Sequence, residues 1–229
     1  MNTNLENHFA NWGTLEYENE DVLSKLDKFQ QVMCWYRSAI REVQTKLEVL
    51  NDEFQSTTSR NPIDNIKSRI KTPKSIYEKL QRRDLPINLC SIMDNLHDVA
   101  GVRVICPFID DIYTVADMLI AQDDIKLLTR KDYIKNPKPN GYRSLHLVVE
   151  VPIFLTGGKR IMKVEVQIRT IAMNFWASLE HQIHYKKIQE DVEDVVDMLT
   201  NCANVIYETD MKMLEIRKDL ENEGKLEMG

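Results

Sequence analysis

The strongest constraint on the fold is the strict alternation of apolar and polar residues in the segment MKVEVQIRT, residues 162–170. A period of two places successive side chains on opposite faces of a β-strand. One face carries Met162, Val164, Val166 and Ile168, and the other carries Lys163, Glu165, Gln167 and Arg169. Such a strand belongs in a sheet with one face against a core and the other face free for solvent or a ligand.

The preceding segment predicts the partner of this strand. LHLVVEV, residues 145–151, is extended and apolar, and Gly157-Gly158 in LTGGKR predicts a hairpin turn between the two strands. The hairpin would bring His146 and Glu150 to the side of the sheet that carries the polar row. We therefore expect catalytic or ligand-binding residues on this face of the sheet.

Helical periodicity marks both ends of the chain. From Val22 to Leu50, and again from Val195 to Leu220, apolar residues recur mainly in steps of three and four, which predicts two long helices. We expect these helices to pack on each other or on another subunit. Apolar stripes at both ends make a homo-oligomer plausible.

The middle of the chain interleaves helices and strands. It predicts helices at 73–80, about 110–121 and 171–187, and strands at 102–106 and 125–129. A hydrophobic content of 43% over 229 residues is enough for a substantial core. The predicted fold class is α/β, with a mixed sheet flanked by helices.

Positive charge is concentrated in two segments of an otherwise acidic chain. The net charge of −6 disfavours nonspecific binding to nucleic acid, and we expect no DNA binding. Residues 65–83 nevertheless carry seven cations against one acid, and residues 126–143 carry six against one. Two solvated surfaces would produce this pattern, and so would a small anionic ligand, with phosphate as the leading candidate.

Cysteine usage and hydropathy indicate the compartment. No apolar run approaches the roughly 18 residues that cross a bilayer, and the first residues lack the pattern of a signal peptide. We therefore expect a cytoplasmic protein without membrane association. Four cysteines without CxxC spacing are expected to be small core residues: Cys34, Cys90, Cys106 and Cys202.

Two carboxylates are candidate ligands of a magnesium ion. Asp98 lies just before the strand at 102–106, and Glu165 lies on the polar face of the hairpin. Mg²⁺ takes oxygen ligands and often only one or two from the protein. His97-Asp98 also matches the dipeptide of histidine-aspartate phosphohydrolases, but that chemistry needs further ligands, and His8 is the only earlier histidine.

Other nucleotide and metal motifs are missing. The sequence contains neither GxxxxGK[ST] nor GxGxxG, and EHQIH at 180–184 is not HExxH, so no metal is predicted there. The loop KNPKPNGYRSLH, residues 135–146, is more informative. Its prolines and Asn-Gly fix the backbone, whereas its cations and tyrosine exceed what a turn requires.

Five segments in order together resemble the synthetase domain of the RelA/SpoT family. They are SRIKTPKSIYEKL (68–80), DVAGVRVIC (98–106), KDYIKNPKPNGYRSLHLVV (131–149), VEVQIRT (164–170) and FWASLEHQIHYK (175–186). The chain length is similar to that of the small alarmone synthetases, without room for the hydrolase domain or regulatory region of long members. The resemblance implies a nucleotidyltransferase-like single domain over 1–229, with a catalytic core at about 60–187 and helical flanks at about 15–55 and 190–222.

The resemblance also implies a reaction. Family members transfer the β,γ-pyrophosphate of ATP to the ribose 3′-hydroxyl of GDP or GTP, which gives ppGpp or pppGpp and AMP in stringent-response signalling. Mg²⁺ is the implied cofactor, held by Asp98 and Glu165. Glu165 would also polarise or deprotonate the 3′-hydroxyl, with Gln167 beside the ribose.

The implied substrate contacts divide between two nucleotides. On the ATP side, Arg69 and Arg103 would sandwich the adenine, and the phosphates would meet Lys71, Ser75 and Lys79. On the acceptor side, Tyr142 would stack on guanine, Lys138 and His146 would contact phosphates, and Asn140 and Asn174 would complete the site.

Two other functions stay open at this point. A noncatalytic RNA-binding module would use the same basic loop and Tyr142, as single-strand binders do. A template-independent nucleotidyltransferase would release pyrophosphate rather than AMP. The terminal stripes and the family's small members favour a homotetramer. The preference for GDP or GTP, and regulation by product or RNA, are not decided by the sequence.

Overall fold

The computed structural model describes residues 22–57, 60–185 and 192–223. Its elements, in chain order, are α2 (Val22–Thr57), β1 (Asn65–Ile70), α3 (Pro73–Arg82), α4 (Leu89–Asn95), β2 (Ala100–Cys106), α5 (Ile109–Ile120), β3 (Lys126–Asp132), β4 (Leu145–Leu155), β5 (Gly158–Thr170), α6 (Ile171–Tyr185) and α7 (Val192–Asn222). The parts of the predicted flanks at 15–21 and 190–191 lie outside the described residues.

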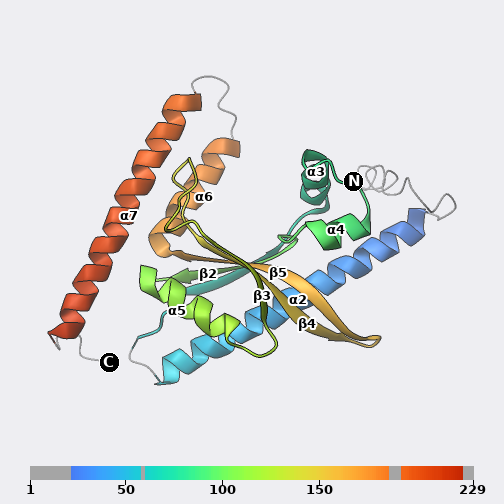
Figure 1. Ribbon diagram of the computed structural model, residues 1–229, viewed down its shortest axis with the longest axis horizontal. Helices are drawn as coiled ribbons and strands as arrows, with labels where there is room; N and C mark the ends of the chain where they lie inside the picture. The colour runs from blue at the N-terminus through green and yellow to red at the C-terminus, as the bar shows by residue number, and fades with distance from the viewer. Residues whose placement is uncertain (1–21, 58–59, 186–191, 224–229) are drawn as a thin grey trace.

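Five strands form one mixed sheet in the order β1-β2-β5-β4-β3 (Figure 1). Only β2 and β5 run parallel, and the other neighbours are antiparallel. The hairpin predicted at Gly157-Gly158 is confirmed, because β4 and β5 pair from Leu145 opposite Ile168 to Leu155 opposite Gly158. The prediction of a mixed sheet flanked by helices is therefore confirmed.

The two faces of the sheet differ completely. Side chains such as Val102, Val149 and Val166 are buried in one continuous core with the apolar faces of α2 and α5. The opposite face carries the polar row of β5 together with polar residues of the other strands. Burial of apolar area therefore holds α2 and α5 against one face of the sheet, and the opposite face stays polar and available for a ligand.

The two long terminal helices have separate partners. α2 packs along the apolar face of the sheet and buries residues such as Tyr36, Val43 and Leu47. α7 stands beside α6 at the other end of the molecule and also contacts α5 (Figure 1). Of the two arrangements expected from the sequence, packing of these helices on each other is therefore not what the described residues show. None of the described helices has both the length and the apolar character needed to cross a membrane.

Two elements were not predicted. β1 has a largely exposed pattern, with only Ile66 and Ile70 packed against the core, so its apolar signal is weak. α4 has seven residues and begins at Asn88, whose side chain accepts a hydrogen bond from the backbone amide of Ser91 at 2.8 Å.

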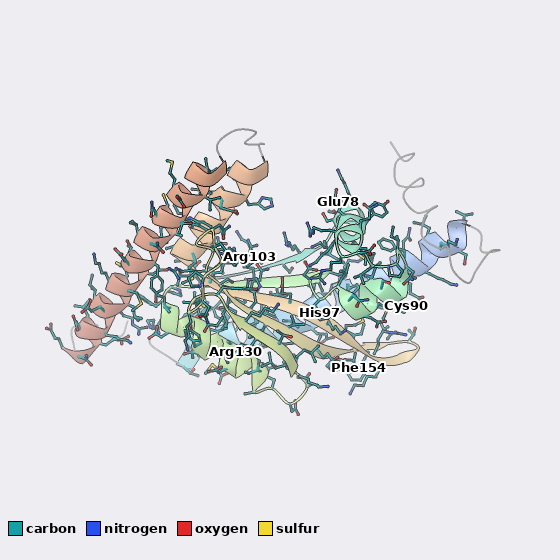
Figure 2. All side chains as sticks on the ribbon, turned by 45° about the horizontal axis from the view of Figure 1, so that its top comes forward. Glu78, Cys90, His97, Arg103, Arg130 and Phe154 are labelled. Carbon is teal, nitrogen blue, oxygen red and sulfur yellow. The ribbon has the colours of Figure 1, made fainter. Side chains whose placement is uncertain are left out.

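The expectation that all four cysteines are core residues is wrong. Cys106 is buried in the core, whereas the other three are exposed (Cys34, Cys90 and Cys202), and Figure 2 labels Cys90 near α4. Each exposed cysteine lies on an amphipathic helix, where the sequence period does not fix the edge of the buried stripe.

A buried ion-pair cluster anchors the C-terminal half of α7. Asp111, at the start of α5, accepts two hydrogen bonds from Arg60, at 2.7 and 2.6 Å. Arg217 of α7 donates to Asp110 at 2.5 Å and lies 3.8 Å from Asp111. Both Asp111 and Arg217 are buried. The cluster therefore ties three segments that are distant in sequence: the chain before β1, α5 and α7.

Asp111→Ala is expected to destabilise the protein by about 3 kcal/mol, because it leaves the buried guanidinium of Arg217 and the half-buried guanidinium of Arg60 without this carboxylate. Urea unfolding monitored by circular dichroism measures the change. The matched control on the same helix is Asp117→Ala, which removes an exposed ion pair with Arg130 and is expected to cost about 0.5 kcal/mol or less. Equal stabilities of the two variants would contradict the anchoring role.

Candidate active site

Two polar rows cross the open face of the sheet. In the first row, Arg69 of β1 lies opposite Gly101 of β2, which in turn lies opposite Glu165 of β5. In the second row, Arg103 lies opposite Gln167, and Gln167 lies opposite His146. Cross-strand partners share a face, so the predicted catalytic and binding residues of four strands come together here.

Asp98 lies between two lysines at the edge of these rows. Its Oδ2 is 2.7 Å from Nζ of Lys71 and 2.6 Å from Nζ of Lys79. Burial acts to raise the pKa of Asp98, but the hydrogen bonds and charges of the two lysines outweigh it and lower the pKa to about 2. Asp98 is therefore ionised at neutral pH. For Lys79, burial is the larger effect and lowers the pKa.

The local sequence explains how these lysines reach Asp98. Thr72 caps the start of α3, where its hydroxyl accepts a hydrogen bond from the amide of Ser75 at 3.3 Å, and Pro73 occupies the first helical position. Lys71 precedes this cap, and Lys79 lies two turns further along the helix. The hydroxyl of Ser75 accepts a further hydrogen bond from the Thr72 hydroxyl at 2.9 Å, so Ser75 lies at the helix start as predicted.

Glu165 is held from both sides. Its Oε2 accepts a hydrogen bond from Nε2 of Gln167 at 2.8 Å, and its Oε1 lies 3.5 Å from Nδ1 of His146. Burial favours the neutral acid, but the contacts with His146 and Gln167 bring the pKa of Glu165 below its ordinary value. The carboxylate is thus ionised and oriented before any substrate binds.

The two predicted metal carboxylates influence each other. The charge of Asp98 acts to raise the pKa of Glu165, which indicates that the two groups are close enough to repel. Oδ1 of Asp98 is buried and has no hydrogen-bond partner among the described residues. An unpartnered carboxylate oxygen beside a second carboxylate fits a hard cation. No group of three or more His, Cys, Asp or Glu side chains forms a metal site within the described ranges.

Three arginines gather near the middle of the site. Burial lowers the pKa of Arg103, and repulsion from Arg169 and Arg69 lowers it further. Nε of Arg103 is buried and has no partner in the described part of the chain, and the side chain extends from β2 (Figure 2). Mutual repulsion and an orphaned donor favour an electron-rich or anionic ligand at this position.

The basic loop between β3 and β4 closes the other side of the site. Gly141 donates a backbone hydrogen bond to Lys138 at 2.8 Å and has a φ of 83°, a left-handed conformation that glycine adopts readily. Nζ of Lys138 lies 4.9 Å from the ring centroid of Tyr133 and 4.8 Å from that of Tyr142. The hydroxyl of Tyr142 is 2.8 Å from Nε2 of His146.

Helices α6 and α7 hold this loop in place. Asn140 donates to Glu180 of α6 at 3.1 Å and accepts from the amide of Tyr142 at 3.2 Å. Both polar ends of the Asn140 side chain thus maintain the shape of the loop, and its predicted role in GDP or GTP binding stays a prediction. From α7, Thr200 donates to the carbonyl of Pro139 at 3.2 Å.

Close packing between the loop and α7 leads to a prediction. A Cβ atom at Gly141 would lie 2.6 Å from Cβ of Ala203 and 3.2 Å from Cα of Thr200, at a φ that strains other residues. Gly141→Ala is therefore expected to displace the loop and raise the KM of the guanine nucleotide about tenfold or more, with little change in the KM of ATP. Steady-state kinetics with each nucleotide varied in turn measures this. Gly157→Ala in the β4–β5 hairpin, where the added atom meets nothing within 4 Å, is the control. Equal rises in both KM values would contradict a local effect on the loop.

Asn174 was predicted as a binding residue, whereas Arg169 was not assigned a role. Asn174 lies on α6, and its Oδ1 is buried without a partner among the described residues, so its role in binding stays a prediction. Arg169 was placed by the sequence on the polar face but was not assigned a role. It is buried and hydrogen bonded to Tyr142 and Gln167 at 2.5 and 2.9 Å. Its position four residues after Glu165 on the same strand was the available signal.

An open sheet face with paired carboxylates between two groups of cations defines a protein that handles polyphosphate ligands. The chain belongs to the RelA/SpoT family, because the family model described as "Region found in RelA / SpoT proteins" matches residues 68–191. Among curated proteins it is 41% identical to GTP pyrophosphokinase YwaC of Bacillus subtilis (strain 168), over 88% of this chain and 96% of that protein. It is 35% identical to GTP pyrophosphokinase YjbM of the same strain, over 85% and 90%.

Solved structures give the same result. The small alarmone synthetase 1 from Bacillus subtilis, bound to its product pppGpp, superposes with a TM-score of 0.78 at 36% identity, over 84% of this chain and 98% of that one. The small alarmone synthetase 2 from the same organism gives a TM-score of 0.75 at 42% identity, over 83% and 98%. The resemblance predicted from five short segments is therefore confirmed over most of the chain.

Proposed function

We propose that this chain is a GTP pyrophosphokinase, which transfers the β,γ-pyrophosphate of ATP to the 3′-hydroxyl of GDP or GTP. The observation that carries the proposal is the placement of Asp98 and Glu165 between the cations at α3 and those of the basic loop. Family membership and the printed activities of YwaC and YjbM support the same reaction.

The ATP half of the site is formed by β1, β2 and α3. Arg69 and Arg103 bind the adenine between their guanidinium planes, which stack well on an aromatic base. Lys71, Lys79 and the start of α3 at Ser75 bind the phosphates, since a helix N-terminus favours anions. In the absence of ATP, the two lysines pair with Asp98 instead.

The acceptor half is formed by the basic loop and β4. The ring of Tyr142 stacks on guanine, and Lys138, whose Nζ lies 4.8 Å from the centroid of that ring, binds the acceptor phosphates together with His146. Gln167 lies beside the ribose. The bond that forms joins the 3′-oxygen to the β-phosphorus of ATP, and the bond that breaks joins that phosphorus to the oxygen of the α-phosphate.

Glu165 is the group that removes the proton of the 3′-hydroxyl. It is ionised, it is oriented at both oxygens, and it lies between the two nucleotide halves. AMP leaves with the electron pair of the broken bond. Transfer between polyphosphates depends mainly on alignment and on neutralising negative charge, and the lysines and arginines of this face supply both.

Asp98 and Glu165 would hold Mg²⁺, which fits the unpartnered oxygen of Asp98 and the mutual influence of the two carboxylates. When bound, the ion neutralises the charge that develops on the transferred group. A homotetramer in the cytoplasm is the assembly and location that the sequence predicts. Analytical ultracentrifugation of the purified protein measures the assembly state directly.

The deciding experiment incubates the protein with γ-labelled ATP, GDP and magnesium, and separates the products by thin-layer chromatography. The expected products are labelled ppGpp and unlabelled AMP in equal amounts. Release of pyrophosphate with a nucleotide monophosphate added to the acceptor would indicate a nucleotidyltransferase. Absence of turnover together with tight binding of single-stranded RNA would indicate the noncatalytic module.

A further inference from the structure

Five side chains on the polar face form a hydrogen-bonded ring, in which four links are hydrogen bonds and the fifth, between His146 and Glu165, is a 3.5 Å contact. Nη2 of Arg169 donates one hydrogen bond to the hydroxyl of Tyr142 at 2.5 Å and another to Oε1 of Gln167 at 2.9 Å. Nε2 of Gln167 donates to Glu165 at 2.8 Å. The Tyr142 hydroxyl lies 2.8 Å from Nε2 of His146, and Nδ1 of His146 lies 3.5 Å from Glu165. The hydrogen-bonded ring thus joins the guanine platform to the catalytic carboxylate.

The direction of these hydrogen bonds follows from Arg169. A guanidinium only donates, so the Tyr142 oxygen and Oε1 of Gln167 are acceptors. The Tyr142 proton is then free to point at Nε2 of His146, which leaves the proton of the neutral imidazole on Nδ1, facing Glu165. The amide of Gln167 is likewise oriented with its nitrogen toward Glu165. Two series of contacts therefore start at Arg169 and end at the two carboxylate oxygens of Glu165. One passes through Tyr142 and His146, and the other passes through Gln167.

The burial of Arg169 makes this arrangement rigid. The residue is 4% exposed, and its guanidinium carbon lies 5.0 Å from the ring centroid of Tyr142. Its Nε donates to the hydroxyl of Ser144 at 3.4 Å, and Ser144 is fully buried. Among the described residues it has no salt bridge to a carboxylate. A buried cation without a carboxylate partner is costly, and its charge is instead distributed over the hydrogen-bonded ring.

We propose that Arg169 is a positioning residue, which holds Tyr142 at the acceptor base and Glu165 at the reacting hydroxyl in one rigid unit. This inference rests on the proposed function. Because Arg169 acts through other side chains, its removal disturbs the orientation of the Glu165 carboxylate more than it lowers the affinity for either nucleotide. The Tyr142 hydroxyl then contributes to turnover separately from the stacking of its ring.

Arg169→Met is expected to lower kcat for ppGpp synthesis about 10- to 100-fold, the range seen when groups that orient a catalytic residue are removed. The KM of ATP should stay within about twofold, because none of the hydrogen bonds of the ring reaches the side chains assigned to adenine or to the ATP phosphates. Arg169→Lys, which keeps a buried donor cation, should recover most of kcat. A rise in the KM of GDP with unchanged kcat would mean direct substrate binding and would overturn the proposal.

Tyr142→Phe tests the same unit without removing a buried charge, and so decides the matter even if Arg169→Met does not fold. The substitution removes the hydrogen bonds of the Tyr142 hydroxyl with Arg169 and His146, and it keeps the aromatic side chain that stacks on the base. The expected result is a loss in kcat of about tenfold, with the KM of GDP changed less than about threefold. In the double variant that combines Arg169→Met with Tyr142→Phe, the loss in kcat should be smaller than the product of the two single losses, since both side chains act through one unit. Wild-type kcat in Tyr142→Phe, or additive losses, would refute the inference, whereas a wild-type protein without ppGpp synthesis would refute the proposed function itself.

Discussion

Glu165→Gln leaves a folded protein whose kcat for ppGpp synthesis falls about 10³-fold or more, since general-base catalysis alone contributes up to about 10⁴-fold. The amide has nearly the same shape, but it accepts no proton and is a poor ligand for Mg²⁺. In the structure the carboxylate accepts a hydrogen bond from Gln167 and lies 3.5 Å from His146, and the oxygen of an amide can keep one of these two contacts. The thermal midpoint should therefore change little while turnover is lost.

The matched control for this substitution is Glu150→Gln. Glu150 lies on the same face of the sheet, on β4, and pairs with Lys126 of β3 at 3.4 Å. Its neutralisation removes one negative charge from the same face and should leave kcat within about twofold. Substantial turnover in Glu165→Gln, measured with labelled ATP and GDP, would exclude the assigned role of Glu165.

Asp98→Asn is expected to reduce kcat/KM for ATP about 10²- to 10³-fold, because it removes a carboxylate proposed to hold Mg²⁺ and the group that places two lysines. Lys71 and Lys79 both contact the same oxygen of Asp98, so its neutralisation leaves two close cations to repel each other. Raising the magnesium concentration should restore part of the activity, as expected for a weakened metal site. This partial rescue separates a lost ligand from a misplaced helix.

The control for Asp98→Asn is Asp94→Asn, at the end of the neighbouring helix α4. Asp94 is exposed, so this substitution removes a nearby charge without touching the two lysines. Activity close to that of the wild type is expected. If both variants lost activity equally, the effect would come from the general electrostatic field and not from the specific contacts of Asp98.

The sequence predicted the strands with strong alternation and the helices with long apolar stripes, but not β1 or α4. The polar face of β1 presents Lys67 and Arg69 to the site, and only two of its residues pack on the core. A strand with charged residues on one face and few apolar residues on the other lacks the alternation by which strands are recognised from sequence. A helix of seven residues has too few turns for its period to be visible.

Site residues within one strand were accessible from the sequence, whereas relations between segments were not. The alternation in β5 placed Glu165, Gln167 and Arg169 on one face. That Tyr142, 27 positions before Arg169, reaches its guanidinium depends on how the basic loop folds against α6 and α7. Such contacts follow from tertiary packing, which no local pattern contains.

The ion-pair cluster of Arg60, Asp111 and Arg217 has a mechanical consequence. It fixes α7 at one end, while Ala203, about 21 Å away along the helix axis, presses on the basic loop. On either side of Ala203, α7 is also tied to α6 and β5, because Trp176 donates to the carbonyl of Leu199 at 3.0 Å and Thr170 donates to Asp210 at 2.5 Å. The basic loop therefore rests on a braced helix, and a change that shifts α7 would displace this loop, to which the proposed function assigns the acceptor nucleotide.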